Sequence, residues 1–333
     1  MTLQEAKYSL SIIFMVCVVC VIPYFQFFTT VFFLGLAIIS AGKIKGIELS
    51  IISIYLIFIF YLSDANSAPD LIGYNSLFSD ANQTGFNTDI FSEPVLPFIY
   101  HVVGGLVQNW KAIDVFDVNV VLLTISILLF LFSLRYRYLC YAVLASLDPF
   151  LTIHLSRQML VIYLVLSAFL LFRPIVSKAI FGFGGILIHH YSVILLPVAV
   201  FMKKDFNHLK TALLLIPTNL AFLFLGPLLL SYTIPILLEN SLISNKILFF
   251  FSIESTDSSF QVKHGLGLLS AFIITLFYRQ ASLYVVIFLF YSALYFLCKE
   301  ISWLGSRLGL PAIGILTLVP VVELGRRLIV KKV

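Results

Sequence analysis

Charged residues are scarce in this chain. Only 11% of its 333 residues are Asp, Glu, Lys or Arg, while 61% are hydrophobic. An ordinary soluble domain carries about 25% charged residues, so a soluble class is excluded. The composition indicates an integral membrane protein built mostly of apolar helices.

Cysteine is also sparse, and the common nucleotide and metal motifs are missing. The four cysteines, Cys17, Cys20, Cys140 and Cys298, all lie in apolar segments and are expected to be small core residues. The absence of Walker A, GxGxxG and GxSxG patterns gives no support for nucleotide use or serine-hydrolase chemistry. There is no HExxH motif, and the adjacent His189 and His190 would point in different helical directions. We therefore expect no metal and no cofactor.

The basic excess is small, with a formal net charge of +5, and it follows the loops. With both ends inside, 15 of the 21 lysines and arginines are cytoplasmic, which satisfies the positive-inside rule. The six outer ones are Lys111, Arg157, Lys246, Lys263, Lys299 and Arg307. This orientation requires 179–202 to be a hairpin that enters the membrane and returns, with His189 and His190 at its tip. Because the charge reflects topology, no nucleic-acid partner is expected.

Apolar segments predict an all-α, polytopic protein of about 10–12 transmembrane or half-depth helices. The expected spans are 8–23, 25–42, 47–62, 114–134, 138–152, 155–172, 179–190, 191–202, 211–232, 264–279, 281–298 and 308–325. Since a full crossing needs about 20 residues, the short pieces at 138–152 and 179–202 are predicted to line a protein or water cavity. No internal repeat is visible, so residues 1–333 are expected to form a single transmembrane domain.

Two hydrophilic segments interrupt the apolar sequence, and both are expected outside the membrane. The larger segment, 63–117, includes a short apolar stretch, Val95–Val107, which is predicted to be a re-entrant or interfacial helix. Unstructured loops of more than about 15 residues are uncommon unless they are functional. The second segment, 233–263, contains an aromatic run at 248–251 that is expected to rest at the lipid surface.

Arg157 and Gln158 open an apolar helix, where lipid would reject both side chains. An arginine at the centre of a membrane helix costs about 2.5–3.5 kcal/mol on insertion scales, so it is by default a candidate for function. Helical spacing predicts that His154, Arg157 and Gln158 share one face, which would be rich in donors and suited to an anion. The alternative is an arginine that snorkels to the headgroups.

Carboxylates of the large outer loop, above all Asp70 and Glu93, are candidate general bases toward a sugar hydroxyl. Two arginines near the membrane surface, Arg157 and Arg307, suit phosphate or pyrophosphate, because a guanidinium binds phosphate oxygens through two parallel bonds. Asp70 has the alternative role of a solvated loop residue or helix cap, and Glu93 before Pro94 could simply open a helix. His189 and His190 are alternatively hydrogen-bonded packing residues.

The order of short motifs resembles a known family. These motifs are Asp70-x-x-x-Tyr74, Glu93-Pro94, Ser156-Arg157-Gln158, His190-Tyr191-Ser192 and Gly305-Ser306-Arg307-Leu308. The resemblance covers most of the chain, from about Tyr55 to Pro320. The arrangement is similar to the EpsG-type branch of bacterial polysaccharide polymerases, which are related in role to the Wzy O-antigen and capsule polymerases.

This resemblance implies a GT-C-like membrane glycosyltransferase of the bacterial plasma membrane. It would join undecaprenyl-pyrophosphate-linked oligosaccharide repeat units on the outer face and use no nucleotide sugar. It implies that Arg157 and Arg307 hold the pyrophosphate, that Gln158 and His190 complete the pocket with Tyr74 and His154, and that Glu93, ahead of Asp70, is the base. Membrane lipid and a chain-length-regulating membrane protein are the other expected partners.

Three other functions compete with this one. A ligase on the outer face would use similar chemistry, and a membrane acyltransferase acting on glycans would need its histidine on a path open to the cytoplasm. A flippase or transporter of lipid-linked oligosaccharide would line a passage with these arginines, but transporters usually show repeated halves. The long outer loop and the one-sided polar cluster favour an enzyme.

Overall fold

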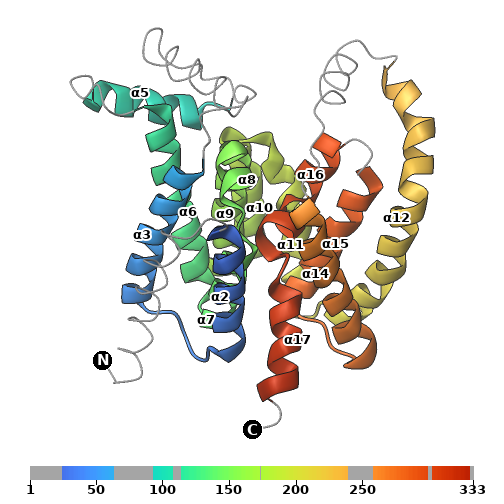
Figure 1. Ribbon diagram of the computed structural model, residues 1–333. Helices are drawn as coiled ribbons and strands as arrows, with labels where there is room; N and C mark the ends of the chain where they lie inside the picture. The colour runs from blue at the N-terminus through green and yellow to red at the C-terminus, as the bar shows by residue number, and fades with distance from the viewer. Residues whose placement is uncertain are drawn as a thin grey trace. The chain divides into compact units, whose positions relative to one another are not determined.

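The computed structural model describes residues 25–63, 93–107, 114–172, 174–238, 258–298 and 302–330. Every regular element in these ranges is a helix, and the one strand-like pairing is an isolated bridge between Lys43 and Tyr136 (Figure 1). The all-α class is therefore confirmed. The expected span 8–23 and the aromatic run at 248–251 lie outside the described residues.

Packing divides the chain into two compact units, each assembled from separate stretches of sequence. Unit 1 comprises Met1–Thr29, Ala41–Cys140 and Asp148–Val200. Unit 2 comprises Thr30–Ser40, Tyr141–Leu147 and Phe201–Val333. Three helices contribute residues to both units: α2 (Phe25–Ile39), α7 (Arg137–Ser146) and α11 (Leu196–Phe201). The single transmembrane domain stays a prediction.

The helices of unit 1 pack around α6, which contacts α9 most extensively and also contacts α3. In chain order they are α3 (Gly46–Leu62), α5 (Val95–Val107), α6 (Val115–Leu134), α8 (Pro149–His154), α9 (Ser156–Leu171), α10 (Ile175–Gly184), the 3-10 helices η3 (Gly185–Leu187) and η4 (His190–Leu195), and α11 (Leu196–Phe201). The apolar stretch Val95–Val107 forms the helix that was predicted for it.

Charged side chains fix both ends of α6. Asp114 accepts hydrogen bonds from the backbone N–H groups of Phe116 and Asp117, and the Asp117 carboxylate accepts from the Asp114 N–H at 3.0 Å. This capping box satisfies the first donors of the helix. Just after its last residue, Arg137 Nε lies 3.0 Å from Glu48 Oε1 of α3, in an ion pair whose glutamate side chain is 3% exposed.

Residues 182–196 of unit 1 fold back on themselves, as the hairpin predicted at 179–202 requires, and the entry of this hairpin into the membrane stays a prediction. A Cβ on Gly182 would touch the Leu196 side chain, and a Cβ on Gly185 would lie 2.6 Å from Ser192 Cβ. These two pairs place the turn near residue 189, so His189 and His190 lie at the tip as expected. Gly185 allows this approach, because any side chain there would collide with the returning segment.

In unit 2, α12 and α15 make the most extensive contact. The elements of this unit are α12 (His208–Leu238), α14 (Ser258–Phe277), α15 (Leu283–Cys298), α16 (Ser302–Leu310), the π-helical segment η5 (Pro311–Leu316) and α17 (Val319–Val330). A Cβ on Gly226 of α12 would lie 2.6 Å from the Phe296 carbonyl oxygen of α15. Glycine therefore permits the close approach of two helix backbones, as it does in many membrane proteins.

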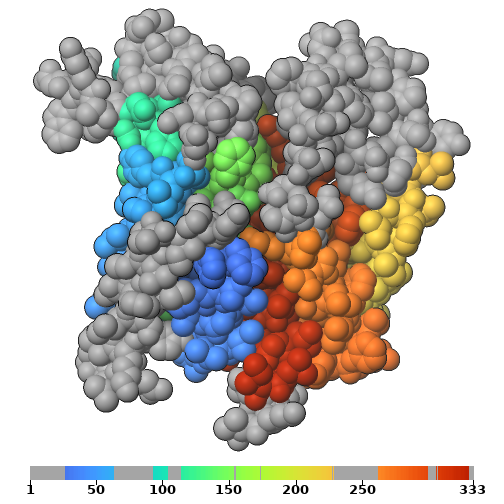
Figure 2. Space-filling model, in the orientation of Figure 1, coloured from blue at the N-terminus to red at the C-terminus, as the bar shows by residue number. Residues whose placement is uncertain are grey.

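The surface of α14 shows that unit 2 is suited to an apolar environment. Val262, Leu266 and Leu269 lie on one helical face and are at least half exposed, whereas His264 and Ser270 are buried. Figure 2 shows α14 beside α17 at the surface of the unit. Apolar side chains outside and polar ones inside are typical of helices in lipid.

Three helical segments among the described residues are long and apolar enough to cross a membrane: Val115–Leu134, His208–Gly226 and Arg307–Ile329. They support a membrane protein, as the composition indicated. Both ends of the segment expected as a loop at 233–263 are helical, because α12 continues to Leu238 and α14 begins at Ser258.

Candidate functional site

The carboxylate of Glu93 lies at the centre of a polar cluster in unit 1. Arg157 Nη1 donates to Oε2 at 3.2 Å. The other oxygen, Oε1, accepts from the backbone N–H of His190 at 3.1 Å and lies 2.9 Å from His190 Nδ1. The Glu93 side chain is 12% exposed. Three segments that are remote in sequence therefore meet here: the chain before α5, the start of α9 and the hairpin tip.

The backbone of Glu93 is in the left-handed region, with φ 55°. For a residue other than glycine such a conformation costs about 1–3 kcal/mol and persists only when the surroundings enforce it. Pro94 follows directly, and its carbonyl accepts from the Phe98 N–H in the first turn of α5. A strained residue that is fixed by a helix start and by two hydrogen bonds to its carboxylate is typical of a functional site.

Arg157 occupies the first turn of α9, where the helix dipole disfavours a cation. No side chain caps this end of the helix, because the N-cap residue is Leu155. The carboxylate of Glu93 supplies the negative charge that an acidic cap would otherwise provide. Since the Arg157 side chain is 31% exposed, its guanidinium remains accessible to a ligand.

The two histidines of the hairpin tip have different roles. His189 Nδ1 accepts the Tyr191 N–H at 3.1 Å, so the proton of the neutral ring lies on Nε2. His189 therefore does not donate to Glu93, although its Nδ1 lies 3.7 Å from Oε1. His190 Nδ1 faces the carboxylate at 2.9 Å, and a neutral ring with its proton on this nitrogen has Nε2 as its acceptor. The His190 side chain is 49% exposed.

The other predicted site residues are distributed as follows. Gln158 is buried, next to Arg157 in α9. Arg307 lies in the last turn of α16, in unit 2, so the cluster described here does not include it. Asp70 and Tyr74 lie outside the described residues. Their roles stay predictions.

One geometric expectation was wrong. His154, Arg157 and Gln158 were predicted to share a helical face, but α8 ends at His154 and α9 begins at Ser156. Leu155 between them has ψ 36°, which is not a helical value, so His154 lies outside the helix that carries Arg157 and Gln158. Sequence spacing alone did not reveal this break. The structure describes the backbone of His154, whose role in the site stays a prediction.

The cluster is suited to anion binding beside a proton acceptor. A partly exposed guanidinium can bind phosphate oxygens. The Glu93 carboxylate lies 2.9 Å from His190 Nδ1, an arrangement in which a carboxylate can orient an imidazole whose Nε2 accepts a proton. The His190 side chain is 49% exposed and that of Glu93 12%, so His190 is the better placed of the two to reach a substrate hydroxyl. The base role of Glu93 stays a prediction.

Comparisons with protein-family models, curated proteins and solved structures find no match for this chain. Within the described residues, no group of three or more His, Cys, Asp or Glu side chains is arranged to hold a metal ion. Functional assignment depends on the geometry of the cluster and on the motifs quoted above.

Proposed function

We propose that this protein is a membrane glycosyltransferase that polymerises undecaprenyl-pyrophosphate-linked oligosaccharide repeat units on the outer face of the bacterial plasma membrane. One observation carries the proposal. Glu93, Arg157 and His190, which belong to three of the motifs of the family resemblance, are in direct contact although 64 and 97 residues separate the first from the other two.

In the reaction we propose, a hydroxyl oxygen of the incoming unit attacks the anomeric carbon of the growing chain. The bond between that carbon and the pyrophosphate oxygen breaks, and the electron pair stays on the pyrophosphate. Arg157 binds the charge that develops there, and electrostatic stabilisation of this kind often contributes most to the rate enhancement of an enzyme. The hydroxyl proton passes to Nε2 of His190, whose ring Glu93 holds in place.

The finer architecture belongs to the same proposal. It comprises about 10–12 transmembrane or half-depth helices in a GT-C-like arrangement, with α5 as the re-entrant or interfacial helix of the outer loop. Both termini would be cytoplasmic. Arg307, Gln158, Tyr74 and His154 would contribute to the binding of pyrophosphate and glycan, and Asp70 is a second candidate base.

The test is polymerisation by the purified full-length protein. Its substrate is the lipid-linked repeat unit, extracted from a strain of the source bacterium that lacks the gene for this protein. Wild-type protein should convert single units into a ladder on a gel. Arg157→Ala should lower the rate by about 10²–10³-fold, as expected for loss of one charge-stabilising donor. Arg157→Lys should restore part of it, because lysine keeps the charge but not the planar fork.

Glu48→Gln is the matched control, since it breaks another ion pair of unit 1 with similar geometry. It should leave the ladder intact in the fraction of protein that remains folded. Two results would contradict the proposal: a ladder of undiminished rate from folded Arg157→Ala, or equal losses in Glu48→Gln and Arg157→Ala.

A further inference from the structure

Residues of unit 2 form a polar cavity that is open to the surface. Its volume is about 610 Å³, and it is lined by Lys204, Asp205, Asn207 and His208 before and at the start of α12, by Gln280 and neighbours between α14 and α15, and by Arg327 of α17. This volume is within the range of about 300–1,000 Å³ that is usual for small-molecule sites.

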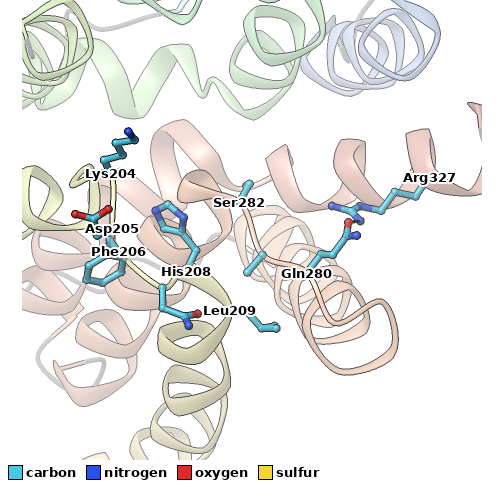
Figure 3. A pocket seen from close by; sticks show the side chains of 10 residues that line it. Lys204, Asp205, Phe206, His208, Leu209, Gln280, Ser282 and Arg327 are labelled. Carbon is cyan, nitrogen blue, oxygen red and sulfur yellow. Dashed lines mark hydrogen bonds between the residues drawn. The ribbon is translucent and has the colours of Figure 1, made fainter.

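At one end of the cavity, Arg327 is held in a defined orientation. Its Nη1 donates to Gln280 Oε1, and its guanidinium carbon lies 6.0 Å from the centre of the Tyr278 ring. Figure 3 shows the Arg327 and Gln280 side chains directed toward each other. Because the Gln280 oxygen accepts from Arg327, its amide NH2 is left as a donor. The guanidinium and this amide together suit a phosphate group.

The other end of the cavity combines a donor and an acceptor. Lys204 and Asp205 are neighbours there, and Lys204 has no hydrogen bond or ion pair with the described residues (Figure 3). His208 lies between the two ends, and its Nε2 donates to the Phe201 carbonyl at 2.8 Å. The Nδ1 of the neutral ring is then an acceptor. An ammonium, a carboxylate and an imidazole acceptor suit hydroxyl groups.

A second carboxylate, Glu323, contacts the cavity lining and interacts electrostatically with Arg327, but it is not itself a lining residue. Glu323 is buried, 8% exposed, and accepts a hydrogen bond from Ser282 at 2.6 Å. The charges that line the cavity are therefore Lys204, Asp205 and Arg327, with one positive charge in excess. Basic loop residues can be present only because they orient the protein in the membrane. Membrane orientation, however, requires neither an arginine held in one position nor a cavity.

We propose that this cavity binds the phosphate ester of a polyol, with the phosphate at the Arg327 end and the hydroxyl groups at the Lys204 and Asp205 end. The ligand can come from the membrane, as the headgroup of phosphatidylglycerol, or from solution, as glycerol 3-phosphate. The shared chemistry is a glycerol phosphate. The site does not depend on the proposed glycan reaction.

The experiment is native mass spectrometry of the purified full-length protein in detergent, with phosphatidylglycerol and glycerol 3-phosphate as probes and phosphatidylcholine as the neutral comparison. We expect one molecule of one of the two probes to bind. Arg327→Gln should weaken that binding by about 10–100-fold, because a hydrogen-bonded charge is lost. Lys204→Gln, a change that removes no contact within the described residues, should weaken binding without affecting the fold.

Arg279→Gln is the matched control, since Arg279 is exposed and adjacent to Gln280 but does not line the cavity. Binding of phosphatidylglycerol alone would identify a lipid site, and binding of glycerol 3-phosphate alone would identify a soluble ligand. Each supports the proposal. No binding of either probe, equal binding of phosphatidylcholine, or an equal loss in Arg279→Gln would overturn it.

Discussion

The coupling between Glu93 and Arg157 can be measured as a free energy of unfolding. Glu93→Ala removes the partner of both Arg157 and His190, whereas Arg157→Ala leaves the contacts between Glu93 and His190 in place. Glu93→Ala should therefore lower the free energy of unfolding more than Arg157→Ala does. For loss of a partly buried, hydrogen-bonded charge we expect about 1.5–3 kcal/mol.

The size of the coupling energy between Glu93 and Arg157 can be estimated from how exposed the two side chains are. Side-chain exposures of 31% and 12% place it between surface ion pairs and fully buried ones. Surface pairs contribute about 0.2–1 kcal/mol, and breaking a buried pair costs about 3–5 kcal/mol. A double-mutant cycle should thus give a coupling of about 1–2 kcal/mol.

The assay is equilibrium unfolding in mixed detergent micelles, followed by tryptophan fluorescence, for the wild type, both single variants and the double variant. Glu93→Asp, which keeps the charge on a shorter side chain, tests whether geometry matters beyond charge. A coupling energy near zero would mean that the two side chains do not interact in the folded protein. The contact between Glu93 and Arg157, on which the candidate site depends, would then be refuted.

Three further predictions concern single positions. His190→Gln should lower kcat of polymerisation by about 10²–10⁴-fold with little change in KM, because a proton acceptor is lost; an unchanged kcat would refute this role. Gly226→Ala should destabilise by about 1–3 kcal/mol through its collision with a backbone carbonyl, whereas Gly265→Ala, which meets nothing within 4 Å, should be neutral or stabilising; thermal unfolding distinguishes them. Tyr163→Phe should leave the unfolding midpoint unchanged or raise it, since the buried hydroxyl has no partner within the described residues.

Much of the helical framework could be predicted from composition and apolar length. The segments 47–62, 155–172 and 281–298 correspond closely to α3, α9 and α15, because long apolar stretches have few alternatives to a helix. The hairpin tip at His189 and His190 was predicted because the lysines on both sides of 179–202 were assigned to the same side of the membrane. Charge distribution therefore carried information about the path of the chain.

The helix break at Leu155 and the contact partners of Glu93 could not be predicted in the same way. A break depends on backbone dihedrals that tertiary packing selects, and no glycine or proline marks it. Glu93, Arg157 and His190 were singled out as candidates, but their contacts depend on how α5, α9 and the hairpin pack. The unit 2 cavity was missed because its basic residues were explained by topology alone.

The most direct test of the proposed function is the release of undecaprenyl pyrophosphate by the purified protein from the lipid-linked repeat unit. Polymerisation predicts one carrier released for each repeat joined, with both quantities lost in Arg157→Ala. Folded wild-type protein that releases no carrier, or that releases it without joining repeats, would contradict the account.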